Sequence, residues 1–575
     1  MKEAGMAGRN FDPVALGILW DRLISISDEI VETLVRTSFS TIVREGYDLS
    51  VMLFDRDGRM LCQGTRSIPV FIGTAPITLA HMLRRFPPDT LRPGDIVVTN
   101  DPMIGTGHLF DICVMRPLYL DGALVGYTMS ITHLPDIGGM GFSAAATEMF
   151  HEGLLLPICK LFREGVVDET LVDVIRRNVR VPEQVMGDIY ANVAACEVGA
   201  RQLVEFMREY AIDDLTPLSR AIREQSEQAV RRKIAEIPDG IYRNRVSIEG
   251  IDGPFEIACT IDKRGDEMAI DFAGSAGCVR AGINVPFCYS RAMAIYAVKC
   301  ITTPTIPNNE GSVAPIRVTA PEGCILNAVP PAPTAGRHVV GHFVTPLVFG
   351  ALAQALPDRV QADSGMANIV TVQGRRPDGA PLSIPYFVAG GFGALAGLDG
   401  ASTTPGPSNM ACVPTEIWES RTGILVERKA LRMDSGGPGE FRGGLGQEIV
   451  LRNDTGHPLT VFSMANRTDF PAAGLHGGMP GALREHLLEG RPVHPKSRQE
   501  LQPGERLTLL EAGGGGIGDP RRRDPAKVRA DVALGFVSPE AAERIYGSTA
   551  VTRTPEHPAA TAEGASSAQT TRGRA

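Results

Sequence analysis

The chain has 575 residues, of which 43% are hydrophobic and 21% charged, as is ordinary for a globular protein with a large buried core. Its net charge of −9 gives no electrostatic reason to expect nucleic acid or an anionic membrane as a partner. No secretory signal and no membrane-spanning apolar run can be recognised. The cysteines are scattered singly, without a CxxC pair, so we expect free thiols and a cytoplasmic protein.

The N-terminal half alternates helical and strand-like segments. Asp12-Pro13 is typical of a helix start, and apolar residues at 19, 23, 26, 30 and 34 predict a helix with one buried face. Two short runs around Asp55-Arg56-Asp57-Gly58 predict a hairpin, and residues 96–98 a buried strand. Helical segments then extend from about residue 170 to Ile237.

The C-terminal half is richer in strands, glycine and proline. Alternating apolar residues at 255–261 and 268–272 predict strands, whereas 339–356 is helical in pattern. We expect an α+β fold, a large multi-lobed subunit of mixed helix and sheet. Its expected parts are an N-terminal metal-binding lobe (1–237), a central α/β lobe (238–433), a β- and loop-rich C-terminal lobe (434–550) and a disordered tail (551–575).

Three potential metal ligands converge on one predicted hairpin in the N-terminal lobe. Asp121-Gly122 is a strong two-residue turn signal, and with it paired positions sum to about 243, which places residue 133 opposite residue 110. His108, Asp111 and His133 then meet at the open end of the hairpin. Because Asp111 would face away from His108 in a regular strand, the site needs a bulge or a loop near residue 109, and the nearby glycines suit such a loop.

Two imidazoles and one carboxylate can hold a divalent transition ion while leaving positions for water or substrate. Such an ion acidifies water and polarises a carbonyl or phosphoryl oxygen, and zinc, manganese and iron all suit these ligands. A His-x-x-Asp pair alone is more often a surface hydrogen bond. Asp136, in His-Leu-Pro-Asp, is open to interpretation as a fourth ligand, an orienting group, a base or a simple turn residue.

Short motifs along the chain resemble the hydantoinase B/oxoprolinase family. They cover roughly residues 12–547 and include NDP-x4-GHLFD (100–111), THLPDIGG (132–139), REGYDLS (44–50), HEGLLLP (151–157), DFAGS (271–275), DSGGPGEFRGGLG (434–446) and GGGGIGDP (513–520). This family includes ATP-dependent N-methylhydantoinases, 5-oxoprolinases and caprolactamases, and also the acetone and acetophenone carboxylases. In the acetone carboxylases two histidines and an aspartate carry manganese, and they match His108, Asp111 and His133.

The resemblance implies the metal-bearing subunit of an ATP-dependent amidohydrolase that opens cyclic amides such as hydantoins, 5-oxoproline or lactams. A hydantoinase A-type partner subunit would bind ATP and phosphorylate the substrate oxygen, in a heterotetramer or a larger assembly. The ion, manganese or zinc and possibly iron, would activate water against the phosphorylated intermediate. For the proton relay we expect Asp136 first and Glu45 second, and Asp48 is a group that could orient a ligand histidine.

Three alternatives remain at this stage. An ATP-dependent ketone carboxylase would keep the same metal ligands, although the acetone carboxylase counterparts are longer than this chain. A mononuclear Fe(II) oxygenase also uses two histidines and a carboxylate, but with different spacing. A scaffold without catalytic function would leave the triad without metal. Elsewhere, we expect the glycine runs 443–446 and 513–516 to form tight turns, and His338 and His342 to be packing or pocket residues.

Overall fold

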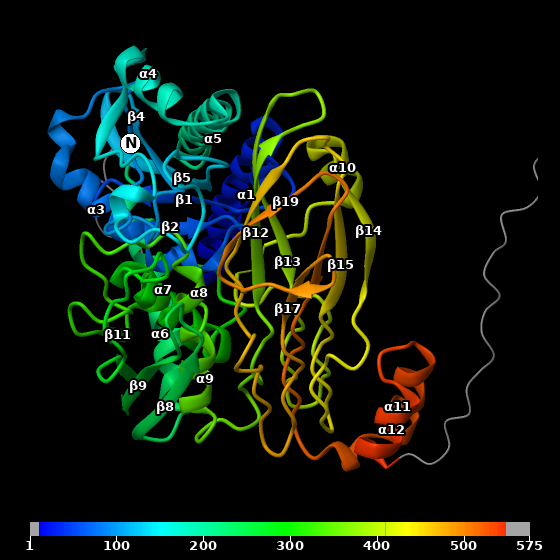
Figure 1. Ribbon diagram of the computed structural model, residues 1–575. Coiled ribbons are helices and arrows are strands. Elements are labelled where there is room, and N and C mark those ends of the chain that lie inside the picture. The colour runs from blue at the N-terminus through cyan, green and yellow to red at the C-terminus, as the bar shows by residue number, and fades with distance from the viewer. Residues whose placement is uncertain (1–10, 409, 548–575) are drawn as a thin grey trace, which may run out of the picture.

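In the computed structural model, which describes residues 11–408 and 410–547, four sheets and their helices form three adjoining regions (Figure 1). The N-terminal region contains one large sheet, the central region a smaller one, and the C-terminal region two sheets packed as a sandwich. The expected α+β fold is confirmed. The predicted tail, residues 551–575, lies outside the described residues.

The N-terminal sheet is antiparallel and is buried on both faces. Its elements are α1 (Pro13–Thr37), α2 (Thr41–Arg44), β1 (Leu49–Asp55), β2 (Met60–Gln63), α3 (Ala75–Arg85), β3 (Ile96–Thr99), β4 (Asp111–Leu120), β5 (Ala123–His133), β6 (Cys159–Arg163), β7 (Val166–Val167), α4 (Glu169–Asn178) and α5 (Pro182–Glu209). The strand order is β2-β1-β5-β4-β3-β6-β7. Asp12 caps α1 by accepting hydrogen bonds from Val14 N and Ala15 N, as its sequence predicted.

Helices α1 and α5 cover one face of this sheet and leave the other to the central region. Leu23 and Ile30 of α1 share a core with Val51 and Leu53 of β1. The side chains of Met52 and Ile112 point the other way, into a core that continues through the central region. Because both faces are buried, the strands contain long apolar runs rather than a clean alternation.

The central region packs a four-stranded sheet against buried helices. Its elements are α6 (Thr216–Ala235), β8 (Gly240–Ile248), β9 (Phe255–Arg264), β10 (Glu267–Asp271), α7 (Phe287–Thr302), β11 (Ile316–Thr319), α8 (His338–Gly341) and α9 (Val344–Leu352). Helix α7 is buried around almost its whole circumference. Arg291 on α7 donates to Gly73 O of the N-terminal region at 3.0 Å, so this helix joins the two regions.

The C-terminal region is a sandwich of two antiparallel sheets, ordered β13-β12-β16-β19 and β14-β15-β20-β17-β18. Its elements are β12 (Ala367–Arg375), β13 (Pro381–Ala389), α10 (Thr415–Thr422), β14 (Ile424–Leu431), β15 (Gln447–Asn453), β16 (Leu459–Ser463), β17 (Glu485–Leu488), β18 (Arg491–Pro492), β19 (Arg498–Leu501), β20 (Arg506–Leu510), α11 (Pro525–Ala533) and α12 (Pro539–Tyr546). Strands from before and after residue 433 pair with each other, so the expected lobe boundary at 433 lies inside the sandwich.

Below the sandwich strands in Figure 1, extended glycine-rich segments run side by side. We call them the glycine bundle; its segments are 390–393, 436–446, 474–481 and 513–516. Their backbones bond directly to one another, as in Gly514 N to Gly444 O at 3.0 Å and Gly444 N to Phe392 O at 2.8 Å. The expectation of tight turns at 443–446 and 513–516 is therefore wrong. None of these glycines has a positive φ; glycine is needed because the backbones approach too closely for a Cβ.

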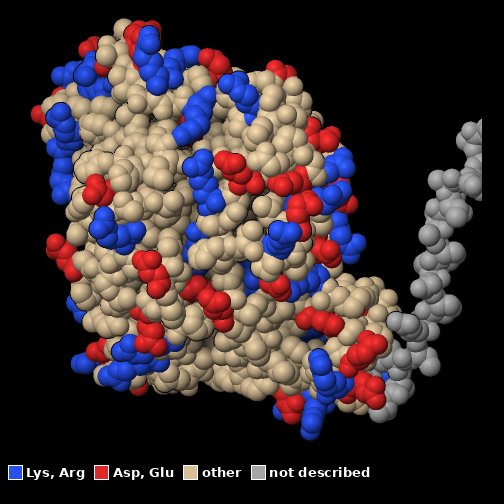
Figure 2. All heavy atoms as spheres, viewed as in Figure 1, with Lys and Arg blue, Asp and Glu red and all other residues tan. Residues whose placement is uncertain are grey.

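The surface gives little sign of a nucleic-acid or membrane partner. Acidic and basic side chains are interspersed on the face shown in Figure 2, without one broad basic area. Within residues 11–408 and 410–547, no helix is both long and apolar enough to span a membrane.

Gly513→Ala should destabilise the protein, because the new Cβ would overlap the carbonyl oxygen of Ser435. Overpacking of this kind typically costs about 1–3 kcal/mol. We expect the first thermal unfolding transition to move down, measured by circular dichroism. Gly17→Ala, on the exposed side of α1 with nothing near its Cβ, is the matched control and should stabilise by about 0.5–1 kcal/mol. Equal transitions for the two variants would contradict the close packing described above.

Candidate metal centre

The β4–β5 hairpin places two of the predicted ligands at its open end. The turn pairs Leu120 with Ala123 as expected, but the register shifts by one residue at Leu118 and Tyr119. As a result Asp111 lies opposite His133, and the predicted pairing of residue 133 with residue 110 is off by one. The irregularity adds one residue to β5 close to the turn, as a β-bulge does.

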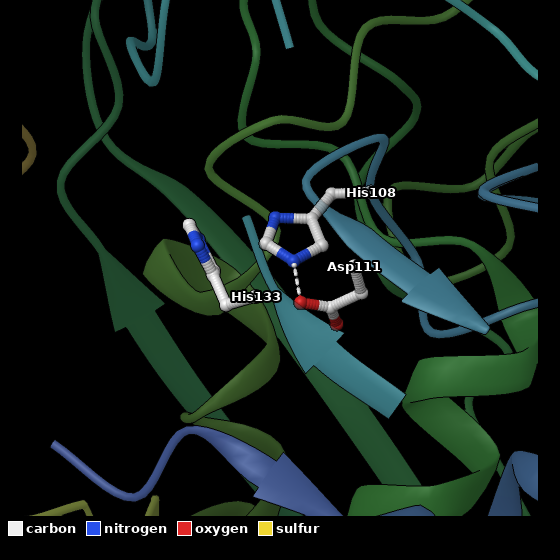
Figure 3. A group of neighbouring side chains, drawn as sticks. All are labelled: His108, Asp111 and His133. Carbon is white, nitrogen blue, oxygen red and sulfur yellow. Dashed lines mark ion pairs between the residues drawn. The ribbon is translucent and has the colours of Figure 1, made fainter. Parts of the chain in front are cut away.

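His108 reaches the hairpin from the loop that precedes β4. Strand β4 begins at Asp111, which confirms the loop that the sequence required near residue 109. Gly107 has a φ of +96°, and a Cβ on it would lie 2.6 Å from Cδ of Arg337. The loop thus turns the imidazole back over the strand start, where His108 Nε2 lies 2.8 Å from Asp111 Oδ1 (Figure 3).

The three side chains form a compact and buried donor set. Ligand atoms of His108, Asp111 and His133 lie within 4.8 Å of one another. Their exposed fractions are 1%, 2% and 4%, respectively. Figure 3 shows the three side chains coming together from the loop, the first residue of β4 and the last residue of β5.

Backbone carbonyls fix the tautomers of both histidines. His108 Nδ1 lies 3.1 Å from Ala335 O, and His133 Nδ1 lies 2.9 Å from Leu134 O. Because a carbonyl only accepts, each Nδ1 carries the proton and each Nε2 presents a lone pair. Both Nε2 atoms lack a hydrogen-bond partner among the described residues, although His108 Nε2 is close to Asp111 Oδ1. Two acceptors that face each other in this way fit a divalent cation between them.

The protonation states match metal binding. Burial, followed by the charge of His108, lowers the pKa of His133 to about 3. Burial and then Arg337 lower the pKa of His108 as well. Burial alone would raise the pKa of Asp111, but His108 and Arg337 outweigh it and hold that pKa below its usual range. At neutral pH the site therefore offers two neutral imidazoles and one carboxylate.

Two residues from distant parts of the sequence hold this donor set. Arg337 donates from Nη2 to Asp111 Oδ2 at 2.9 Å, and its guanidinium lies 4.2 Å from the centre of the Tyr289 ring. The carboxylate of Glu152 is fully buried and accepts from Ala335 N at 2.7 Å, which positions the residue whose carbonyl binds His108. The sequence interpretation missed both roles. The only available signal was the location of Glu152 in the HEGLLLP motif.

A cavity of about 40 Å³ opens beside the triad. Its lining contains His108, His133, Asp48, Phe142, Tyr289, Arg337, His338 and His342, together with apolar residues. The pocket interpretation of His338 and His342 is thus confirmed. Burial, and then the neighbouring Asp111, raise the pKa of the Asp48 carboxyl to about 8, against the opposing effect of Arg337.

The two residues expected to relay protons lie outside this lining. Asp136 is buried, and its carboxylate accepts from Arg180 Nη1 at 2.7 Å, from Gly138 N at 3.2 Å and also from Arg180 N. Glu45 is partly exposed, with Oε1 4.0 Å from Arg44 Nε. Their catalytic role remains a prediction. Asp48 is the carboxylate that the fold brings into the cavity.

A family model described as Hydantoinase B/oxoprolinase matches residues 12–520. Caprolactamase subunit beta of Pseudomonas jessenii is 31% identical to this chain over 570 residues, covering 93% of this chain and 96% of that subunit. A 5-oxoprolinase of Pestalotiopsis fici is 28% identical over 553 residues, covering 90% of this chain and 42% of that longer protein. The similarity therefore extends over nearly the whole chain.

Two solved structures share the fold. The crystal structure of the ATP-dependent caprolactamase from Pseudomonas jessenii matches with a TM-score of 0.87 and 28% identity, over 94% of this chain and 96% of that one. A nucleotide-free acetone carboxylase matches with a TM-score of 0.83 and 20% identity, over 94% of this chain and 80% of that one. At the identity of the carboxylase, the match shows a common architecture and nothing more.

His108→Ala and His133→Ala should each abolish bound divalent metal, because each removes one of only three converging donors. Manganese, zinc and iron in the purified protein can be measured by plasma mass spectrometry, with circular dichroism to verify the fold. His151→Ala removes an exposed histidine of the same region and is the control. Metal at the wild-type level in both triad variants would remove the site from consideration.

Asp48→Asn should weaken metal binding by about tenfold or more, the usual effect of losing a charge beside a ligand shell. Asp48 and Asp111 are close enough to repel each other, and a divalent cation between them would relieve that repulsion. Competition with a fluorescent chelator gives the affinity. Glu45→Gln makes the same acid-to-amide change outside the cavity and should leave the affinity unchanged. Equal affinities for both variants would separate Asp48 from the metal site.

Proposed function

Since the chain belongs to the hydantoinase B/oxoprolinase family, we propose that it is the metal-bearing subunit of an ATP-dependent hydrolase of cyclic amides. The observation that carries this proposal is the buried donor set of His108, Asp111 and His133, with two imidazole lone pairs that no described residue satisfies. It lies in a chain similar over almost its full length to a caprolactamase beta subunit.

The chemistry requires two activities. The carbonyl of a lactam or an imide is a poor electrophile, and phosphorylation of its oxygen makes the ring carbon attackable. The chain lacks the G-x-x-x-x-G-K-[ST] signature of a P-loop nucleotide site, so we assign ATP binding and phosphorylation to a hydantoinase A-type partner subunit. The names of the beta subunit and of the caprolactamase relatives support an assembly of two kinds of subunit, a heterotetramer or larger.

A divalent ion held by His108, Asp111 and His133, whether manganese, zinc or iron, would acidify water and polarise an oxygen of the activated substrate. The other residues prepare the site for this. The carbonyls of Ala335 and Leu134 keep both Nε2 atoms unprotonated, and Arg337 holds Asp111 in place. The burial of the triad excludes bulk water from competing reactions.

A carboxylate in the cavity is the simplest proton acceptor. Asp48 lines the cavity and its pKa of about 8 suits proton exchange near neutral pH. Asp136 remains the alternative that the sequence favoured, followed by Glu45. For Asp136 to act, its bonds to Arg180 would have to open. All ten cysteines are free thiols, which supports the proposed location in the reducing cytoplasm.

The second candidate is an ATP-dependent ketone carboxylase, supported by the fold shared with acetone carboxylase. Chain length favours the hydrolase. The match covers 96% of the caprolactamase chain but only 80% of the carboxylase chain, so the carboxylase contains additional structure that this protein lacks.

Co-expressed with its ATP-binding partner, the chain should release phosphate from ATP when a cyclic amide is added and should form a ring-opened acid. Hydantoins, 5-oxoproline, lactams and small ketones would each be tested with and without bicarbonate, with products identified by mass spectrometry. The complex that contains His133→Ala is the control and should form no ring-opened product. Turnover only with a ketone and bicarbonate would contradict the hydrolase and establish the carboxylase.

A further inference from the structure

The metal cavity has a second polar wall that the triad does not use. His338 lies at the start of α8 and His342 directly after its end, so they are one helical turn apart. Their ring centres are 5.6 Å apart, and both side chains are almost completely buried, with exposed fractions of 3% and 4%. Both line the same cavity as His108 and His133.

These two imidazoles are without partners. Both ring nitrogens of His338 and Nδ1 of His342 are buried and have no hydrogen-bond partner among the described residues. Polar atoms buried in native proteins are nearly always hydrogen-bonded, so nitrogens that face a cavity in this state indicate a polar ligand. A metal ion on the triad would account for the unpartnered atoms of His108 and His133, but not for these.

The ring of Phe142 connects the two walls. It stacks on His338 with ring centres 5.5 Å apart, and it contacts His108 and His133 edge-on at 5.7 and 5.2 Å. The histidine pair is therefore one aromatic ring away from the metal ligands. A molecule with its reacting carbon at the triad can place a neighbouring group on His338.

The electrostatics of this wall favour an anion. The charge of Arg337 acts on both His338 and His342, in addition to their burial, to keep them neutral. Arg337 uses Nε for Thr106 O and Nη2 for Asp111, whereas its Nη1 makes no hydrogen bond to the residues described here. Each neutral imidazole has one N–H to donate. The wall thus combines one fixed cation with two donors, a set suited to several oxygens of one oxyanion.

We propose that His338 and His342, together with Arg337, bind the phosphoryl group of the phosphorylated cyclic amide. This assignment rests on the proposed function and adds the place where the activated end of the substrate is held. With the phosphoryl oxygens on the histidine pair, the carbon that carries the phosphorylated oxygen faces the triad. Inorganic phosphate, a product of the same reaction, presents the same tetrahedral oxygens and is the probe.

The test is titration calorimetry of inorganic phosphate into the manganese-loaded full chain. We expect the wild type to bind phosphate, and His338→Phe and His342→Phe each to lower the affinity about tenfold, as for one lost hydrogen bond to a charged ligand. The double variant should lose about a hundredfold. Manganese content should stay at the wild-type level in all three, since neither residue belongs to the triad.

Two further variants separate binding from packing. His342→Gln retains an N–H donor and should bind phosphate within a few fold of the wild type, whereas His151→Phe makes the same change at an exposed site and should have no effect. The proposal is overturned if the wild type binds no phosphate, or if the double variant binds it as well as the wild type with manganese retained. Because no amide or partner subunit enters this titration, its result is independent of whether a cyclic amide is turned over.

Discussion

The buried carboxylate of Asp111 is the constraint around which the candidate site is built. Removing such a charge from water costs several kcal/mol unless it is paired. Its partners within the chain are the guanidinium of Arg337 and the imidazole of His108. Arg337 and the carbonyl of Ala335 come from the central region, whereas the ligands come from the N-terminal sheet. Docking of these two regions therefore determines both the charge balance and the tautomer of the site.

Sequence patterns predicted the parts of this arrangement that depend on near neighbours. The Asp12-Pro13 helix start, the Asp121-Gly122 turn and the approach of His133 to Asp111 all follow from local spacing. The register shift at Leu118 and Tyr119 could not be predicted, because β4 and β5 are buried on both faces and their apolar pattern does not mark the inserted residue. The contribution of Arg337 was also beyond reach, since it lies 226 residues from its partner Asp111.

Family membership and cavity geometry answer different questions here. The relatives indicate a reaction class, ATP-dependent opening of cyclic amides, but they do not say how the cavity divides its work. The geometry separates a wall of metal ligands from a wall of unpartnered histidines, with Phe142 between them. A site with two polar walls and an aromatic divider suits a substrate that carries two distinct polar groups on neighbouring atoms.

The glycine bundle has an evolutionary consequence. Every single-nucleotide change that replaces a glycine introduces at least a Cβ, and at Gly391, Gly443, Gly513 and Gly515 that atom would overlap a backbone carbonyl. No conservative replacement exists at such positions. Purifying selection should therefore hold these codons fixed whatever ring or ketone a given lineage processes. A stretch that looks like low-complexity linker in the sequence would then be among the slowest-evolving parts of the gene.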